Sequence, residues 1–130
     1  MRGHNPIDEK MNLETLIKSL YKQLINDSCA FYQDMFINRT EQDVTDPYWK
    51  ESLKMFANLS NEDRKTFFKV IEQVQVDSMS EILGILDGVV WVDGDVKFNV
   101  TLGDGGIPIN GELQELFLAY DEEKRPRNKE

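Results

Sequence analysis

Apolar side chains recur at helical spacing over the first third of the chain. Between residues 8 and 37 they fall at Leu13, Leu16, Ile17, Leu20, Leu24, Phe31 and Met35, as on one face of a helix. No glycine or proline interrupts this span. The pattern predicts one long helix of roughly 45 Å at the standard rise. The three poor helix formers at residues 26–28 mark the point where it could break.

Two further helices are predicted downstream. Asp46 before Pro47 is a helix-start signal, because the carboxylate can cap the helix and proline suits its first position. This short helix should end near Asn58. Ser60 then caps a long third helix, and Gly88 is suited to the left-handed position that follows the end of a helix. The apolar stripe expected on the third helix is Phe67, Ile71, Val74, Ser78, Ile82 and Leu86.

After Gly88 the hydrophobic period changes from 3.6 to 2, which is typical of strands. Two apolar segments, 89–92 and 96–102, flank Asp93 and Gly94, a strong hairpin signal. The alternation places one set of side chains on the buried face: Val89, Trp91, Val96, Phe98, Val100 and Leu102. Residues 107–109 could add an edge strand, and Asn110 could cap a last helix at about 111–120.

The predicted fold class is therefore α+β. Two long helices and a short one are followed by a β-hairpin or small antiparallel sheet and a C-terminal helix. Residues 8–121 should form a single domain, between an N-terminal arm (1–7) and a charged tail (122–130). The core is expected at Leu16, Leu20, Leu24, Phe31, Phe67, Ile71, Val74, Ile82, Trp91, Phe98, Val100, Leu113 and Phe117.

Negative charge is concentrated in the C-terminal half. Residues 74–123 hold eleven acids and one base, Lys97, a net charge of −10 within a total of −9. Such a field repels nucleic acid and anionic lipid and speeds encounter with basic proteins. We expect a basic protein partner and no binding to nucleic acid or membranes. No apolar run is long enough to span a bilayer, and one cysteine without an export signal favours a cytoplasmic protein.

Few catalytic groups are available. His4 is the only histidine and Cys29 the only cysteine, so neither a histidine base nor a multi-cysteine metal site is expected. Cys29 is expected to be a small side chain on a helix face. We expect no enzymatic activity and no cofactor. The alternative is a divalent-metal hydrolase, with ligands from the carboxylates near the ends of the hairpin: Asp87, Asp93, Asp95 and Asp104.

The favoured hypothesis is a non-catalytic protein-binding module. In size and charge the chain resembles small acidic immunity proteins and inhibitors of bacteria, a resemblance that no motif carries. A homodimer of structural role is a further alternative, because Val90 and Val92 lie on the sheet face that the helices would leave uncovered. The candidate partner-binding residues are Asp87, Val90, Val92, Asp93, Asp95, Asp104 and Tyr120.

Overall fold

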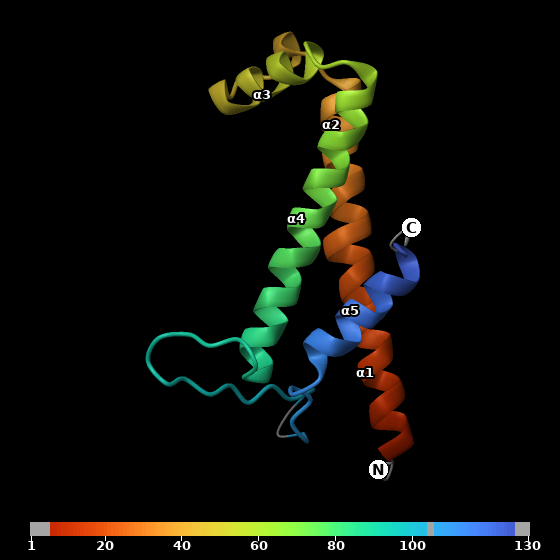
Figure 1. Ribbon diagram of the computed structural model, residues 1–130, viewed down its shortest axis with the longest axis vertical. Helices are drawn as coiled ribbons and strands as arrows, with labels where there is room; N and C mark the ends of the chain where they lie inside the picture. Colours follow the sequence, from red (N-terminus) through yellow and green to blue (C-terminus); the bar gives the residue numbers. More distant parts are fainter. Residues whose placement is uncertain (1–5, 104–105, 127–130) are drawn as a thin grey trace. The chain divides into compact units, whose positions relative to one another are not determined.

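The computed structural model describes residues 6–103 and 106–126, and for residues 6–12 it describes the backbone alone. Every regular element in these residues is helical (Figure 1). In chain order the elements are α1 (Pro6–Tyr21), the π-helical η1 (Lys22–Asp27), α2 (Ser28–Asn38), the 3-10 helix η2 (Glu41–Asp43), α3 (Pro47–Ala57), α4 (Asn61–Asp87) and α5 (Leu113–Lys124).

The predicted α+β class is wrong. The described residues contain no β-strand, and the segment expected to form a hairpin is an open loop that joins α4 to α5 (Figure 1). We call residues 88–112 the connecting loop. Its backbone pairing in the described residues is limited to an isolated antiparallel bridge between Thr101 and Pro108.

The position of the turn explains why the hairpin does not form. A two-residue hairpin turn of the type that favours Asp-Gly needs positive φ at both central residues. Here the positive values fall one residue later, at Gly94 (100°) and Asp95 (51°). Aspartate tolerates this left-handed conformation. The turn is therefore displaced by one residue from the position that the Asp93-Gly94 signal predicts, which disrupts the register of the two arms.

The Asn110 side chain makes hydrogen bonds to the backbone that a partner strand would otherwise make. Asn110 accepts a hydrogen bond from the backbone N–H of Val100 (3.0 Å) and donates to the carbonyl oxygens of Phe98 (2.9 Å) and Leu86 (2.7 Å). An amide can do this because it carries both donors and acceptors. Asn110 therefore does not cap α5, as the sequence predicted, but fastens the returning arm of the loop to the end of α4.

The first long helix runs without a gap from Pro6 to Asn38, so the prediction of a single helix is confirmed. Its winding changes to π-helical in η1, which includes the weak helix formers Asn26 and Asp27. Helix α1 begins at Pro6 and α5 extends to Lys124. These helices therefore include part of the ranges predicted as arm and tail.

The chain divides into two compact units, of which residues 23–75 form one. Its core holds Phe36, Leu53 and Phe56, surrounded by Tyr32, Val44, Trp49, Leu59, Phe67, Phe68 and Ile71. The rings pack edge-on or tilted, as Phe36 does against Phe67 at 4.9 Å between centroids, an arrangement that aromatic quadrupoles favour. The predicted caps are confirmed, because Asp46 accepts from the N–H of Tyr48 and Ser60 from that of Asp63.

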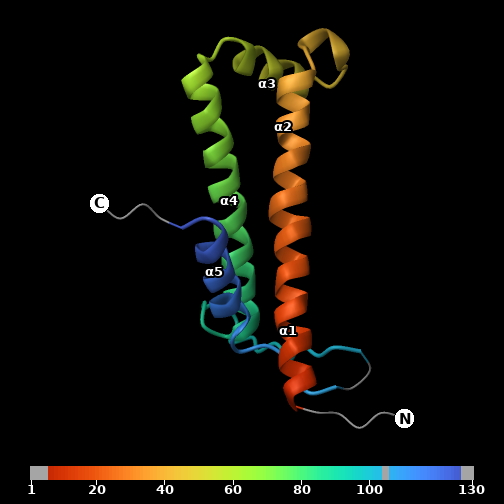
Figure 2. The same cartoon turned by 90° about the vertical axis from the view of Figure 1, so that its right-hand side faces the viewer.

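The other unit combines residues 1–22 with residues 76–130. Helix α5 packs against α1 (Figures 1 and 2). The buried side chains are Ile17, Tyr21, Val76, Leu83, Leu113 and Phe117. Gly84 allows close approach, since a Cβ there would lie 2.5 Å from Cγ2 of Val90 and 2.6 Å from Nε2 of Gln114. The same Gln114 amide donates to the Ser80 carbonyl oxygen at 3.1 Å.

The predicted core is correct at Leu113 and Phe117 and wrong at several other positions. Leu24, Phe31, Val74, Ile82, Trp91 and Phe98 are exposed. On α4 the buried stripe is Val76, Ser80, Leu83 and Gly84, because the small Ser80 and Gly84 face α5. The predicted stripe followed the larger apolar residues and so missed the face on which α5 packs. Gly88 does have the expected positive φ of 78° after α4.

Tyr21 is a buried polar side chain of this unit. It is only 1% exposed, and its hydroxyl donates to the Asp121 carboxylate at 2.7 Å. Arg125 holds the same carboxylate through Nε at 2.7 Å. Burial, together with the hydrogen bond to Asp121, raises the pKa of Tyr21 far above its ordinary value.

Truncation of the core should separate the observed packing from the predicted one. Phe117 is fully buried and Phe98 is 42% exposed. We expect Phe117→Ala to lower the free energy of unfolding by about 3–5 kcal/mol, and Phe98→Ala to change it by less than about 1 kcal/mol. Urea denaturation followed by circular dichroism measures both. Comparable losses in the two variants would contradict the exposed position of Phe98.

The raised pKa of Tyr21 also predicts a pH dependence. Unfolded tyrosine ionises near about pH 10, and the folded protein holds Tyr21 protonated beyond that point. The stability that this difference supplies is complete below the unfolded pKa and is lost as the pH rises toward the folded one. We expect the wild type to lose stability above about pH 10 more steeply than Tyr21→Phe. Equal slopes in urea titrations across this range would contradict it.

Candidate functional site

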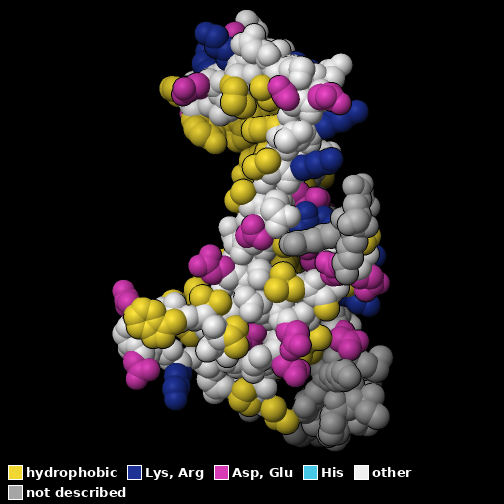
Figure 3. Space-filling model, in the orientation of Figure 1, with side chains coloured by type: hydrophobic (Ala, Val, Ile, Leu, Met, Phe, Trp, Pro, Cys, Tyr) yellow, Lys and Arg dark blue, Asp and Glu magenta, His cyan; other side chains and the backbone are white. Residues whose placement is uncertain are grey.

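The connecting loop exposes large apolar side chains that a folded protein normally buries. They are Val89, Trp91, Val96, Phe98, Leu102 and Ile107, which we call the loop patch. Trp91 is the most exposed at 77%. Figure 3 shows hydrophobic side chains on this loop with acidic ones beside them. Exposed large apolar side chains with charged side chains beside them are typical of protein interaction sites.

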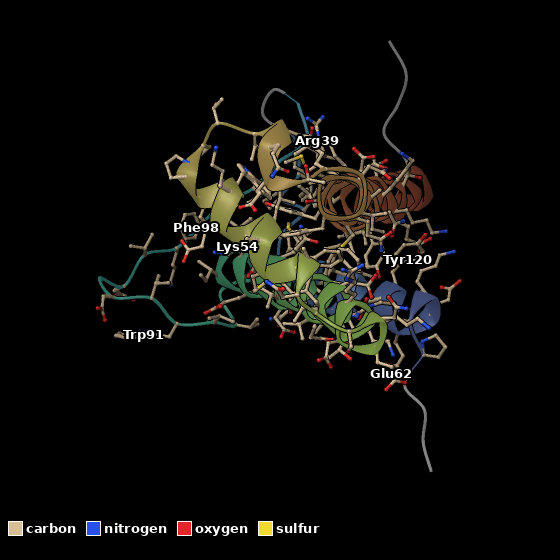
Figure 4. All side chains as sticks on the ribbon, turned by 90° about the horizontal axis from the view of Figure 1, so that it is seen from above. Arg39, Lys54, Glu62, Trp91, Phe98 and Tyr120 are labelled. Carbon is tan, nitrogen blue, oxygen red and sulfur yellow. The ribbon has the colours of Figure 1, made fainter. Side chains whose placement is uncertain are left out.

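The two arms of the loop enclose a hollow with the last turn of α4. It has a volume of about 350 Å³ and is lined by apolar side chains, including Trp91 and Phe98, together with Asp95 and Lys97. Trp91 lies on the outgoing arm and Phe98 on the returning arm (Figure 4). The hollow therefore offers aromatic side chains, the Asp95 carboxylate and the Lys97 ammonium to an incoming side chain.

Asp87 has a structural task at the base of this loop. Its Oδ1 accepts hydrogen bonds from the N–H groups of Gly111 (2.6 Å) and Leu113 (3.1 Å), and its Oδ2 accepts one from Gln114 (2.7 Å). The first N–H groups of a helix lack partners within the helix and carry partial positive charge. Asp87 thus caps α5 from the end of α4, although the sequence suggested a partner-binding or metal-binding residue.

The other acids predicted as site residues do not take part in this cap. Asp93 and Asp95 are exposed at the tip of the loop, beside the exposed Lys97. Asp104 lies outside the described residues. In the part of the chain that the structure describes, no three histidine, cysteine or acidic side chains gather as metal ligands would. His4 also lies outside that part. Cys29 donates from Sγ to Oε1 of Gln75 at 2.7 Å.

The predicted apolar candidates divide between two places. Val90 and Val92 are half-buried, and Val90 packs over Gly84. This orientation follows from the end of α4, where the N–H groups of Val89 and Val90 both donate to the Gly84 carbonyl oxygen. Tyr120 lies on α5, edge-on to Tyr21 and within 5.8 Å of the Lys18 ammonium. It is therefore held against α1 and is not part of the loop patch.

Sequence reasoning missed Trp91 and Phe98 as surface residues. It assigned both to the core because they alternate with polar residues in a segment with strand period. The signal that could have raised doubt is the pair Val90 and Val92, which left the other face of the same segment apolar as well. A segment with apolar residues on both faces must be buried on both sides or expose one of them.

No helix in the described residues combines the length and apolar character required to cross a bilayer. Comparisons with protein-family models, with curated proteins and with solved structures gave no match.

Removal of the Asp87 carboxylate should loosen the loop and α5 together. Asp87→Ala leaves three N–H groups without their acceptor, that of Gly111 just before α5 and those of Leu113 and Gln114 in its first turn. We expect a loss of about 2 kcal/mol in the free energy of unfolding. Glu81→Ala, an exposed position on the same helix, is the matched control and should change stability by less than about 0.5 kcal/mol. Chemical denaturation measures both, and a neutral Asp87→Ala would contradict the capping role.

Proposed function

We propose that this chain is a non-catalytic binding protein that docks a basic protein partner through the connecting loop. The observation that supports the proposal best is the loop patch, above all Trp91, which is 77% exposed and held on a loop anchored at both ends. Tryptophan is among the residues that most often dominate binding energy at interfaces. An immunity or inhibitor protein that covers the cationic active site of a toxin is the most concrete form of this function.

The hollow of the loop suits a lysine or arginine side chain of that partner. A cation between Trp91 and Phe98 would interact with the aromatic faces, and the Asp95 carboxylate lines the same hollow. A cation over an aromatic ring contributes about 0.5–2 kcal/mol, more when water is excluded. The apolar residues around it would exclude that water, as the rim of an interface does.

The negative charge of the C-terminal half would speed the encounter with a basic partner. Residues 74–123 carry a net charge of −10, and such a field raises the association rate with basic proteins, most strongly at low salt. The same field disfavours nucleic acid and anionic membranes. We propose a cytoplasmic location, where a reduced thiol such as that of Cys29 is stable. The metal-hydrolase alternative is less well supported, because Asp87 is engaged by three backbone N–H groups and no cluster of three ligand side chains occurs among the described residues.

Paired substitutions test the proposal in a low-salt pull-down from the source cell. We expect Trp91→Ala to weaken binding of the captured basic partner roughly thirtyfold, which corresponds to about 2 kcal/mol at an interface anchor. Tyr48→Ala is the matched control, because Tyr48 is a similarly exposed aromatic outside the loop. Isothermal titration with the purified partner gives the two affinities.

The acidic rim is tested separately through kinetics. Asp93→Asn/Asp95→Asn retains the turn, because asparagine also tolerates the left-handed conformation at residue 95. We expect a slower association rate and a weaker dependence on salt, with a smaller effect on dissociation. Capture of no basic protein, or a partner whose affinity is unchanged by both Trp91→Ala and Asp93→Asn/Asp95→Asn, would contradict the proposal.

A further inference from the structure

A second apolar surface lies in the unit of residues 23–75. It is a groove of about 890 Å³ between the end of α2, helix α3 and the start of α4. Its apolar lining includes Phe36, Leu53, Phe56 and Phe68. These belong to or pack against the aromatic core of this unit, so the groove has a rigid floor.

The rim of the groove is cationic, although the chain as a whole is acidic. Four of the lining residues are basic, namely Arg39, Lys54, Arg64 and Lys65, whereas Glu41 is the only acid among them. Arg64 is engaged, since it donates to the carbonyl oxygens of Phe56 and Ala57 at the end of α3. Arg39 and Lys54 extend from different elements (Figure 4), and both are exposed. Arg39, Lys54 and Lys65 form no ion pair with the described residues.

We propose that the groove of one molecule receives the connecting loop of a second copy of this chain. The inference rests on the proposed function, because it uses the same loop as the docking element and names a basic apolar surface that it would recognise. The loop presents apolar side chains beside Asp93 and Asp95. The groove presents an apolar floor beside Arg39, Lys54 and Lys65.

The loop and the groove are complementary both in apolar character and in charge, which favours a second copy of the chain over an unrelated occupant. Trp91 and Phe98 are aromatic anchors that would bury against the phenylalanines of the groove, where most of the binding energy of an interface arises. The two exposed aspartates would face unpaired cations, and such pairing fixes orientation and excludes wrong partners. Each chain carries both the loop and the groove, so every copy can offer its loop to one neighbour and receive a loop in its groove.

A charge exchange tests the proposal in sedimentation velocity. We compare the wild type with a loop variant, Asp93→Lys/Asp95→Lys, and a groove variant, Lys54→Glu/Lys65→Glu. The wild-type mass should rise above the 15.1 kDa monomer with concentration and fall with salt. Each variant alone should self-associate at least about tenfold more weakly, since like charges then meet. An equimolar mixture should associate again, because one interface is then native and the other has its charges exchanged.

Matched variants control for net charge. Lys50→Glu/Lys69→Glu makes the charge change of the groove variant at positions outside the groove lining. Glu122→Lys/Glu123→Lys makes the charge change of the loop variant on α5, outside the loop. Both should associate as the wild type does. Circular dichroism melting establishes that every variant is folded.

Three results would overturn the inference. The first is a wild type that stays monomeric from about 1 to about 300 µM, a range that covers weak and moderate affinities. The second is self-association that neither variant weakens, and the third is a mixture that remains monomeric. The groove variant keeps the loop unchanged, so its low-salt pull-down tests the proposed function alone. Capture of a basic partner without self-association would support the proposed function and contradict the loop-to-groove contact. Self-association without capture would support the loop-to-groove contact and contradict the proposed function.

Discussion

The Asp87 carboxylate is the contact on which the arrangement of the C-terminal half depends. It lies at the last position of α4, yet its oxygens accept from the backbone of Gly111, Leu113 and Gln114. A single side chain thus joins the end of one helix to the start of another that lies 26 residues later. Because a helix start carries unpaired donors and partial positive charge, the carboxylate stabilises α5 and sets both ends of the connecting loop at one point.

That closure explains how an irregular loop can present a large apolar surface. Asn110 adds a second tie between the returning arm and the end of α4. Gly84 lets Val90 and Gln114 approach the helix closely. With its base held in this way, the loop needs no strand pairing for its position, and the side chains on its outer side, Trp91 above all, remain available for contact. Order at the base and exposure at the tip are the combination that a preorganised binding surface requires.

Both candidate surfaces combine apolar with charged side chains, and their charges are of opposite sign. The loop combines apolar side chains with aspartates, and the groove of residues 23–75 combines phenylalanines with lysine and arginine. In both, the apolar part would supply binding energy and the charged part orientation and encounter rate. Clustering the acids in residues 74–123 keeps the loop acidic and leaves the groove as a local cationic site.

The sequence by itself determined the helices, their caps at Asp46 and Ser60, the end of α4 at Gly88 and the location of the acidic half, because these follow from local periodicity, backbone preference and charge. Tertiary structure decided which faces are buried and whether residues 89–102 form a sheet. The stripe on α4 follows Ser80 and Gly84, small residues whose burial depends on α5 lying against them. The hairpin failed because the positive φ values fall at Gly94 and Asp95 and because Asn110 takes the backbone groups that a strand would have paired. Such choices depend on residues distant in the chain, and no local pattern contains them.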